Sequence, residues 1–143
     1  MIKIIALMFI FGSTFFPPGV SAAVPRESGD LLQELQFRKT EYYLAIEWPY
    51  PPRTGRNKFL LKSWQKSRGT LNGPYQDLPM NLAVTLWMPS MGFGSSPVKL
   101  KKTAVGEYEV SDVYFITSGK WEVRLQLLNA GKVYDEVVLH YNL

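Results

Sequence analysis

The sequence predicts an all-β fold, an immunoglobulin-like antiparallel β-sandwich of about seven strands that follows a signal peptide. Three observations predict it. Apolar and polar residues alternate in most segments from residue 42 to the end, as they do in half-buried strands. Glycine, proline and asparagine separate these segments at short intervals, which is typical of turns. The first residues have the layout of a secretory signal.

The N-terminal signal is predicted at residues 1–23. Lys3 supplies a positive start, residues 4–16 are an apolar run, and small residues follow the prolines that end it. We expect cleavage after Ala22 or Ala23 and an exported domain, in the periplasm or cell envelope. A retained membrane anchor is the alternative, although the run is shorter than the roughly 17–25 residues that a membrane span needs.

The exported part is divided into two regions. Residues 24–54 are expected to be an N-terminal segment with the first strand, and residues 55–143 the sandwich core. A weak helix-like stretch covers residues 30–39. The strands are expected at residues 42–48, around residues 58–62, and at residues 80–88, 98–103, 108–111, 113–116, 121–127 and 132–141.

Each strand prediction depends on a pattern that can be read directly. Trp121, Val123, Leu125 and Leu127 alternate with charged or polar residues in the clearest half-buried pattern of the chain. The turn at residues 129–131 contains a glycine and predicts a hairpin into the last strand. A long loop at residues 65–79 interrupts the alternation.

The composition argues against most catalytic chemistry, so we expect a protein that is not an enzyme. The chain has no cysteine, which excludes thiol nucleophiles and zinc–thiolate sites. His140 is the single histidine, and its position in the alternation places it on an exposed strand face. Glu107 and Glu109 share one face of a strand, as a solvated edge would, with no sign of the coupling that acid–base catalysis requires. No catalytic residue and no small-molecule substrate is predicted.

The charge pattern bears on the kind of partner. Lysine and arginine number 16 against 12 acidic residues, but the basic residues are scattered. A nucleic-acid surface needs a denser basic stripe, so no nucleic-acid partner is expected. A membrane or periplasmic protein is the expected partner.

Methionine, proline and glycine are concentrated in one segment, at residues 86–97. Thioether sulfur suits Cu(I), and a tight turn would bring Met88 and Met91 together as tentative ligands. Met88 is also in phase with the apolar side of its strand, which predicts core packing instead. Phe93 lies between Gly92 and Gly94, where a histidine would have added a stronger ligand. We favour packing and keep metal contact as the alternative.

The same segment carries a family resemblance. The run MPSMGFGSSPV at residues 88–98 is followed by GEY at residues 106–108 and GKWEV at residues 119–123. With these blocks in this order, the chain resembles the FixH/YtkA-like family of small exported or membrane-anchored bacterial β-sandwich domains. The resemblance implies a β-sandwich and an accessory role linked to copper handling, cation-pump operons or cytochrome oxidase assembly. Many members have histidine where this chain has Phe93, so the ligands carried over are Met88 and Met91.

Two functional hypotheses follow. The first is a non-enzymatic exported accessory domain of the FixH/YtkA-like kind, with weak Cu(I) binding through Met88 and Met91. The second is a metal-free protein-interaction module whose loop presents apolar side chains to another protein. The residues assigned to this interaction loop are Trp87, Pro89, Gly92, Phe93 and Gly94.

Overall fold

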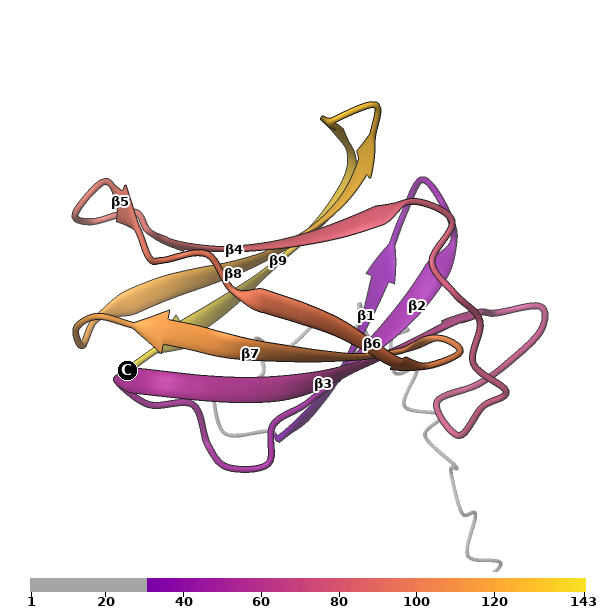
Figure 1. The fold of residues 1–143 in the computed structure, drawn as a ribbon, viewed down its shortest axis with the longest axis horizontal. Coiled ribbons are helices and arrows are strands. Elements are labelled where there is room, and N and C mark those ends of the chain that lie inside the picture. Colours follow the sequence, from indigo (N-terminus) through magenta and orange to yellow (C-terminus); the bar gives the residue numbers. More distant parts are fainter. Residues whose placement is uncertain (1–30) are drawn as a thin grey trace, which may run out of the picture.

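The computed structural model describes residues 31–143, which form two antiparallel sheets facing each other (Figure 1). The prediction of an all-β sandwich is confirmed, with nine strands in this part of the chain. The predicted signal at residues 1–23 lies outside the described residues. The strands are β1 (Leu32–Phe37), β2 (Tyr42–Glu47), β3 (Gly55–Gln65), β4 (Asn81–Met88), β5 (Phe93–Gly94), β6 (Lys99–Ala104), β7 (Glu107–Phe115), β8 (Lys120–Asn129) and β9 (Lys132–Asn142).

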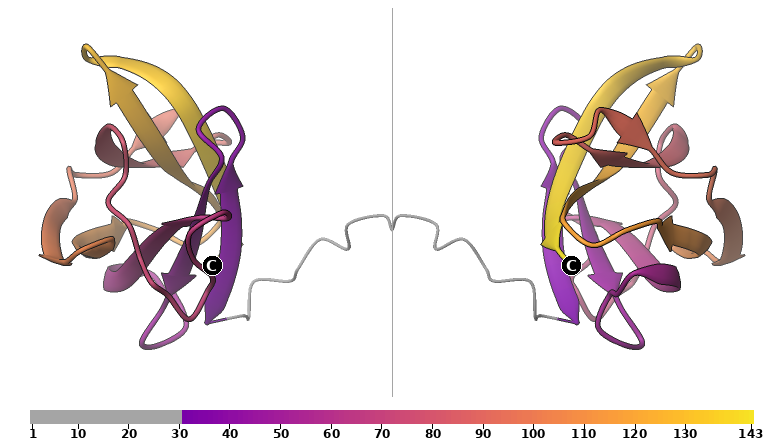
Figure 2. Two further views of the ribbon diagram at one scale, coloured as in Figure 1. Left: turned by 90° about the vertical axis from the view of Figure 1, so that its right-hand side faces the viewer. Right: turned by 90° about the vertical axis from the view of Figure 1, so that its left-hand side faces the viewer.

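The two sides of the sandwich, where the edges of the sheets meet, are built differently. One sheet has the strand order β1-β2-β3-β7-β6 and the other has the order β5-β4-β8-β9. On one side of the sandwich, Asp135 of β9 accepts hydrogen bonds from the backbone N–H groups of Lys39 and Thr40, at 2.7 and 3.1 Å, and so joins the β1–β2 turn to the second sheet. The other side lies between β4 and β6 and faces the viewer in Figure 1; Figure 2 shows it edge-on.

Aromatic residues fill much of the core between the sheets. Trp48 and Tyr141 are nearly inaccessible to solvent, and the indole Nε1–H of Trp48 donates to the Tyr141 hydroxyl at 3.0 Å. Trp121 packs edge-on against Phe115 at a ring-centroid distance of 5.5 Å. The alternation predicted for β8 is confirmed because Trp121, Val123, Leu125 and Leu127 all have zero exposure. This burial supplies the main stabilisation of the sandwich.

The predicted helix-like stretch at residues 30–39 is wrong, because this region contains strand β1. Leu35 pairs with Leu44 of β2, and the pairing runs along the whole of β1. Gln33 and Phe37 are buried while Leu32 and Glu34 are exposed, which is the alternation of a strand. The backbone partner offered by β2 outweighs the weak helical preference of this short segment.

The two strands expected at residues 108–111 and 113–116 form one strand, β7. A bulge explains the broken alternation: Phe59 of β3 pairs with Val110, whereas Asn57 pairs with Val113. Asp112 has a φ of 54° at this point. The extra residue turns both Val110 and Val113 toward the core although they are three positions apart. No helix in the described part of the chain is long and apolar enough to cross a membrane.

Candidate functional site

The methionine segment forms the hairpin between β4 and β5. Met88 pairs with Phe93, and Trp87 pairs with Gly94. The Met88 carbonyl accepts hydrogen bonds from the N–H groups of Met91 and Gly92, at 3.2 and 2.9 Å. These bonds close the turn at residues 89–92, and all four turn residues are exposed. The hairpin therefore projects its tip into solvent.

Met88 lies in the core and does not reach the tip of the hairpin. Its side chain is 2% exposed and is part of the same apolar cluster as Leu86 and Trp121. Its terminal methyl is 2.7 Å from the position where a Cβ on Gly119 would stand. Gly119 has a φ of 128°, so glycine is favoured there by both backbone and space.

Met91 is 65% exposed, in contrast to Met88. The structure thus places one thioether in the core and the other in solvent, and a metal ion shared by both would require Met88 to leave the core. Residues 31–143 contain no group of three or more His, Cys, Asp or Glu side chains placed to hold a metal ion. Cu(I) binding by the methionine pair stays a prediction.

The residues of the interaction loop lie on two faces of the hairpin. Phe93 pairs with Met88 and packs edge-on against Trp121 at 6.0 Å, so its half-buried ring completes the core. Trp87 is one position away from Met88 and therefore faces outward from the sheet. There the Arg124 guanidinium lies over the indole at 5.7 Å, and Arg124 also pairs with Glu122 at 2.6 Å. Trp87 and Phe93 do not form one continuous surface.

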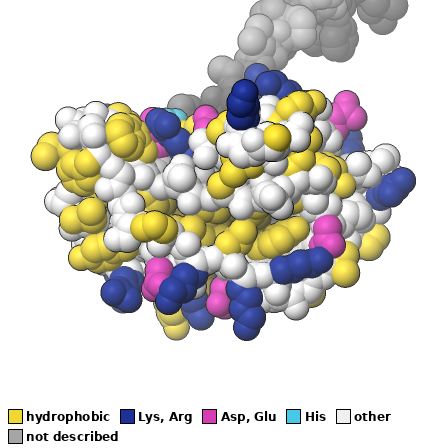
Figure 3. All heavy atoms as spheres, turned by 45° about the horizontal axis from the view of Figure 1, so that its top comes forward, with side chains coloured by type: hydrophobic (Ala, Val, Ile, Leu, Met, Phe, Trp, Pro, Cys, Tyr) yellow, Lys and Arg dark blue, Asp and Glu magenta, His cyan; other side chains and the backbone are white. Residues whose placement is uncertain are grey.

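A groove lies beside the hairpin on the open side of the sandwich, and the sequence did not point to it. Its volume is about 490 Å³. Apolar side chains from β4 and β6 line much of it, and Figure 3 shows a band of apolar side chains across the middle of this face. The lining residues are Leu82, Ala83, Val84, Thr85, Leu86, Trp87, Gly94, Ser95, Ser96, Pro97, Val98 and Leu100.

The backbone of β4 is open toward this groove. Strand β5 pairs with β4 only at Trp87 and Met88, and the Leu86 carbonyl accepts a further bond from the Ser95 N–H at 3.4 Å. Backbone groups two residues apart in a strand point to the same edge, so those of Val84 and Leu82 also face the groove. Within residues 31–143, no strand pairs with β4 there. We call this stretch, residues 82–85, the open β4 edge.

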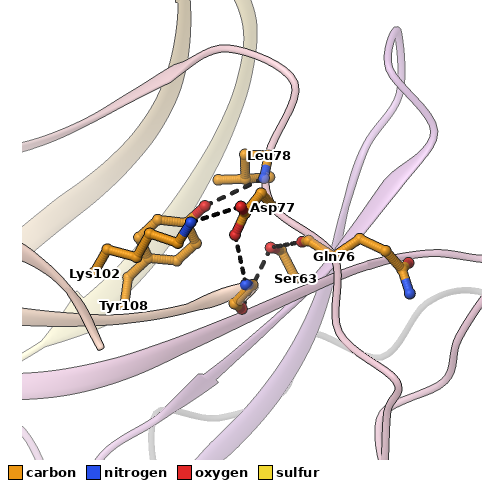
Figure 4. Close-up of polar contacts among 7 residues, drawn as sticks. Ser63, Gln76, Asp77, Leu78, Lys102 and Tyr108 are labelled. Carbon is orange, nitrogen blue, oxygen red and sulfur yellow. Dashed lines mark hydrogen bonds and ion pairs between the residues drawn. The ribbon is translucent and has the colours of Figure 1, made fainter. Parts of the chain in front are cut away.

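One end of the groove is held by a polar cluster that fixes the loop before β4 (Figure 4). Asp77 accepts from the Gly106 N–H at 2.7 Å and pairs with Lys102 of β6 at 2.6 Å. The Leu78 N–H donates to the Tyr108 hydroxyl at 3.2 Å. These contacts tie the long loop to the five-stranded sheet and so define where β4 begins.

The same cluster accounts for two shifted pKa values. The hydrogen bond from Lys102, with that from the Gly106 N–H, lowers the pKa of Asp77 below its usual 3.8. The bond to Asp77 raises the pKa of Lys102 above its usual 10.5. Gly106 is also sterically restricted: a Cβ there would lie 2.7 Å from the backbone N and O of Gln76. The loop packs this closely only against glycine.

The other end of the groove is closed by the crossing segment at residues 95–98. The Ser95 hydroxyl donates to the carbonyl of Tyr114 on β7, which ties this segment to the five-stranded sheet. Val98 then packs against the core before β6 begins. The groove therefore has fixed ends, and its long side is formed by the open β4 edge.

Charge is distributed unevenly around the groove. Residues 78–98 contain no charged side chain, so the β4 border is neutral. On β6, Lys99 and Lys101 pair in register with Ser111 and Glu109 and therefore lie on the outer face of the five-stranded sheet, whereas Leu100 lines the groove. Lys99 also pairs with Asp112 at 3.1 Å, and Lys102 pairs with Asp77.

Two polar side chains of β9, those of His140 and Tyr141, are solvated and structural, respectively. His140 lies on the exposed face of β9 opposite Glu122, as predicted. Tyr141 is buried, which raises the pKa of its hydroxyl to about 12, and it serves as the acceptor for Trp48. Comparison with protein-family models, curated proteins and solved structures finds no match to this chain.

Proposed function

We propose that this chain is a non-enzymatic protein-interaction module whose contact surface is the open side of the sandwich. One observation carries the proposal: the open β4 edge lies next to an apolar groove with fixed ends. An unpaired strand edge is a template for pairing with another chain, and natural sheets usually blunt or cover it. β6 follows that rule with its lysines, whereas the neutral β4 edge does not.

The exposed tip of the β4–β5 hairpin extends this surface. Met91 is a flexible, polarisable side chain that adapts to varied apolar partners, and it lies in solvent beside the end of the groove. Trp87 on the outer face adds a large apolar ring next to Arg124, a pairing common at protein interfaces. Phe93 supports the hairpin from within.

An exported accessory role is consistent with this surface and with the FixH/YtkA-like resemblance. In that role the partner is a membrane or periplasmic protein, and the domain presents its open side to it. Cu(I) binding is the second candidate. The burial of Met88 weakens it, because the pair of thioethers does not converge.

Site-specific photo-crosslinking in the expressing cells tests the proposal. A photoreactive residue at Met91 is compared with one at Val133, which is 51% exposed near the start of β9. We expect adducts of one defined mass at position 91 and none at position 133. Equal adduct patterns at the two positions, or no adduct at position 91, would exclude the hairpin as the contact surface.

A further inference from the structure

We propose that a pocket at the start of β3 binds the phosphate group of an organic ligand. Arg53, Arg56 and Lys58 hold the phosphate, and Tyr50 contacts the organic part. The pocket shares no lining residue with the groove beside β4. It is therefore a second site, and it does not depend on the interaction function proposed above.

The pocket lies where the β2–β3 loop meets the outer face of β3 and β7. Its volume is about 300 Å³, at the lower end of the range for small-ligand sites. Lys58 points to the outer face because its neighbour Phe59 is completely buried. Tyr50 of the loop is 80% exposed and forms part of one wall. In Figure 1 this loop lies at the lower edge of the molecule, before the start of β3.

Four basic side chains meet at this pocket. Arg53, Arg56 and Lys58 line it, and Lys99 reaches it through an ion pair with Asp112. All four basic residues are exposed. Lys99 is distant from the others in the sequence, but the pairing of β6 with β7, and of β7 with β3, brings it to the same face.

Asp112 is the one acidic residue in the lining, and each of its oxygens already faces a cation. Oδ1 is 3.5 Å from Nη1 of Arg56, and Oδ2 is 3.1 Å from Nζ of Lys99. Asp112 thus positions these two side chains at the pocket and cancels one of the four positive charges. Arg53 and Lys58 form no ion pair within residues 31–143.

The nearest other carboxylates on this face of the sheet have cationic neighbours of their own. Glu47 pairs with Lys62 at 3.2 Å. Glu109 lies directly opposite Lys101 in the register of β6 and β7, as oppositely charged cross-strand pairs do. These carboxylates therefore leave the positive charge of the pocket in place.

Glu34 and Glu107 lie farther along the same face. Glu107 is opposite Lys62, and Glu34 is opposite Ala45, which itself pairs with Lys62. Lys62 is four positions after Lys58 on β3, which corresponds to roughly 13 Å. That separation exceeds one screening length at physiological salt. The end of the sheet at the pocket is therefore locally positive.

The lining chemistry favours phosphate over other anions. Arginine presents planar pairs of donors that match phosphate oxygens, and lysine adds a point charge. The hydroxyl of Ser111, also in the lining, supplies one more donor. A carboxylate has a single charge and two oxygens, so it uses fewer of these groups. The cations gather at one pocket and form no stripe, which suits one phosphate group and not a nucleic-acid backbone.

The loop that carries Tyr50 and Arg53 is ordered without a ligand. Asn57 accepts a hydrogen bond from the Arg53 N–H at 3.0 Å and donates to the carbonyls of Arg53 and Gly55, at 2.7 and 2.9 Å. Prolines occupy three of the four positions 49–52 and fix their φ angles. A loop that is already ordered loses less entropy when it binds. The exposed ring of Tyr50 offers an apolar surface with a polar tip to the organic part of the ligand.

Amide NMR shifts of the purified protein test the site with soluble probes. The probes are inorganic phosphate, glycerophosphoglycerol and succinate, compared at equal ionic strength. We expect both phosphate probes to shift the amides of Lys58 and Asp112. Glycerophosphoglycerol should bind more tightly than inorganic phosphate, because its organic part contacts Tyr50. Succinate should bind at least fivefold more weakly than either.

A pair of double variants matched in residue type isolates the basic side chains. Arg53→Gln with Lys58→Gln should weaken both phosphate probes tenfold or more, because two charge-assisted hydrogen bonds are lost. Lys66→Gln with Arg68→Gln removes the same two residue types from exposed positions just after the far end of β3 and should change neither affinity.

Tyr50→Ser tests the organic part of the ligand separately. It should weaken glycerophosphoglycerol about two- to fivefold, the range of modest apolar contacts, and leave inorganic phosphate unchanged. The side chain is exposed, so the fold should be unaffected.

Vesicles identify the source of the phosphate group. If vesicles containing phosphatidylglycerol sediment the parent, and vesicles of phosphatidylcholine alone or the Arg53→Gln, Lys58→Gln variant give no such sedimentation, the ligand is a membrane lipid. Binding of glycerophosphoglycerol without sedimentation identifies a soluble phosphodiester.

Three results would overturn the inference. These are no shift at Lys58 or Asp112 with either phosphate probe at millimolar concentration, equal binding of succinate and the phosphate probes, and equal losses in the two double variants.

Discussion

The terminal methyl of Met88 lies 2.7 Å from the place that a Cβ on Gly119 would occupy. This contact joins the β4–β5 hairpin to the start of β8, and Gly119 also exchanges two backbone hydrogen bonds with Leu143, at 2.7 and 2.9 Å. The hairpin tip is exposed, but its base is locked into the core. A rigid base beside an open strand edge is a suitable frame for a binding surface.

Gly119→Ala should destabilise the fold by about 2–3 kcal/mol, because a side chain at this φ is strained and its methyl would clash with Met88. Urea unfolding measures the loss. The double variant Gly119→Ala with Met88→Ala should lose less free energy of unfolding than the sum of the losses of the two single variants, because the shortened side chain relieves the clash. A loss under about 0.5 kcal/mol for Gly119→Ala, within the range of ordinary surface substitutions, would show that the contact has no consequence.

Met88→Leu should leave any Cu(I) affinity unchanged, because the sulfur of Met88 is in the core and not at the exposed tip. The substitution conserves volume, so the free energy of unfolding should change by less than about 1.5 kcal/mol. Competition with a chromogenic Cu(I) chelator measures the affinity of the parent, of Met88→Leu and of Met91→Leu. If the Cu(I) affinity of each single variant fell tenfold or more, both sulfurs would be ligands and the hairpin would have to rearrange.

The Asp77–Lys102 pair should stabilise the protein across the neutral range. Asp77 has a lowered pKa in the folded state, so its contribution to stability is fully present above about pH 3.8. This contribution disappears as the pH falls through the pKa of the folded state. Lys102 has a raised pKa, so its contribution is lost only as the pH rises above 10.5. Urea midpoints of the parent and of Asp77→Asn should differ by a constant amount from about pH 5 to 9 and converge in stronger acid. A constant difference down through strong acid would contradict this role.

Tyr141→Phe should destabilise the fold by about 1–3 kcal/mol, because it leaves the buried Trp48 N–H without its acceptor. The hydroxyl also makes stability fall at high pH. Its pKa rises from 10.0 to about 12 on folding, so the unfolded state loses its proton first and the parent loses stability between these values. Unfolding measured across that range should show a steeper decline for the parent than for Tyr141→Phe. Parallel declines in the free energy of unfolding would mean that ionisation of Tyr141 does not contribute to the loss of stability at high pH.

Alternation identified the strands well wherever one face is buried and the other solvated. β8 is the clearest case, since its four apolar residues are completely buried as expected. β1 was missed because its preference is weak and its pairing with β2 is a tertiary effect. The bulge at Asp112 shifts the alternation by one residue, which split β7 into two apparent strands.

The candidate site was harder to predict. The sequence drew attention to the hairpin, but alternation alone does not show that Trp87 and Phe93 separate onto two faces. The groove depends on which strands are neighbours: β4 and β6 belong to different sheets and meet only across the open side. One signal was available, the absence of charge throughout residues 78–98, followed at once by three lysines within residues 99–102.

Hydrogen exchange at four consecutive amides tests the open β4 edge most directly. Ala83 and Thr85 point their N–H groups toward β8, whereas Leu82 and Val84 point theirs into the groove. We expect slow exchange at Ala83 and Thr85 and fast exchange at Leu82 and Val84 in the free protein. Equal protection of all four amides in the free protein would contradict an open edge.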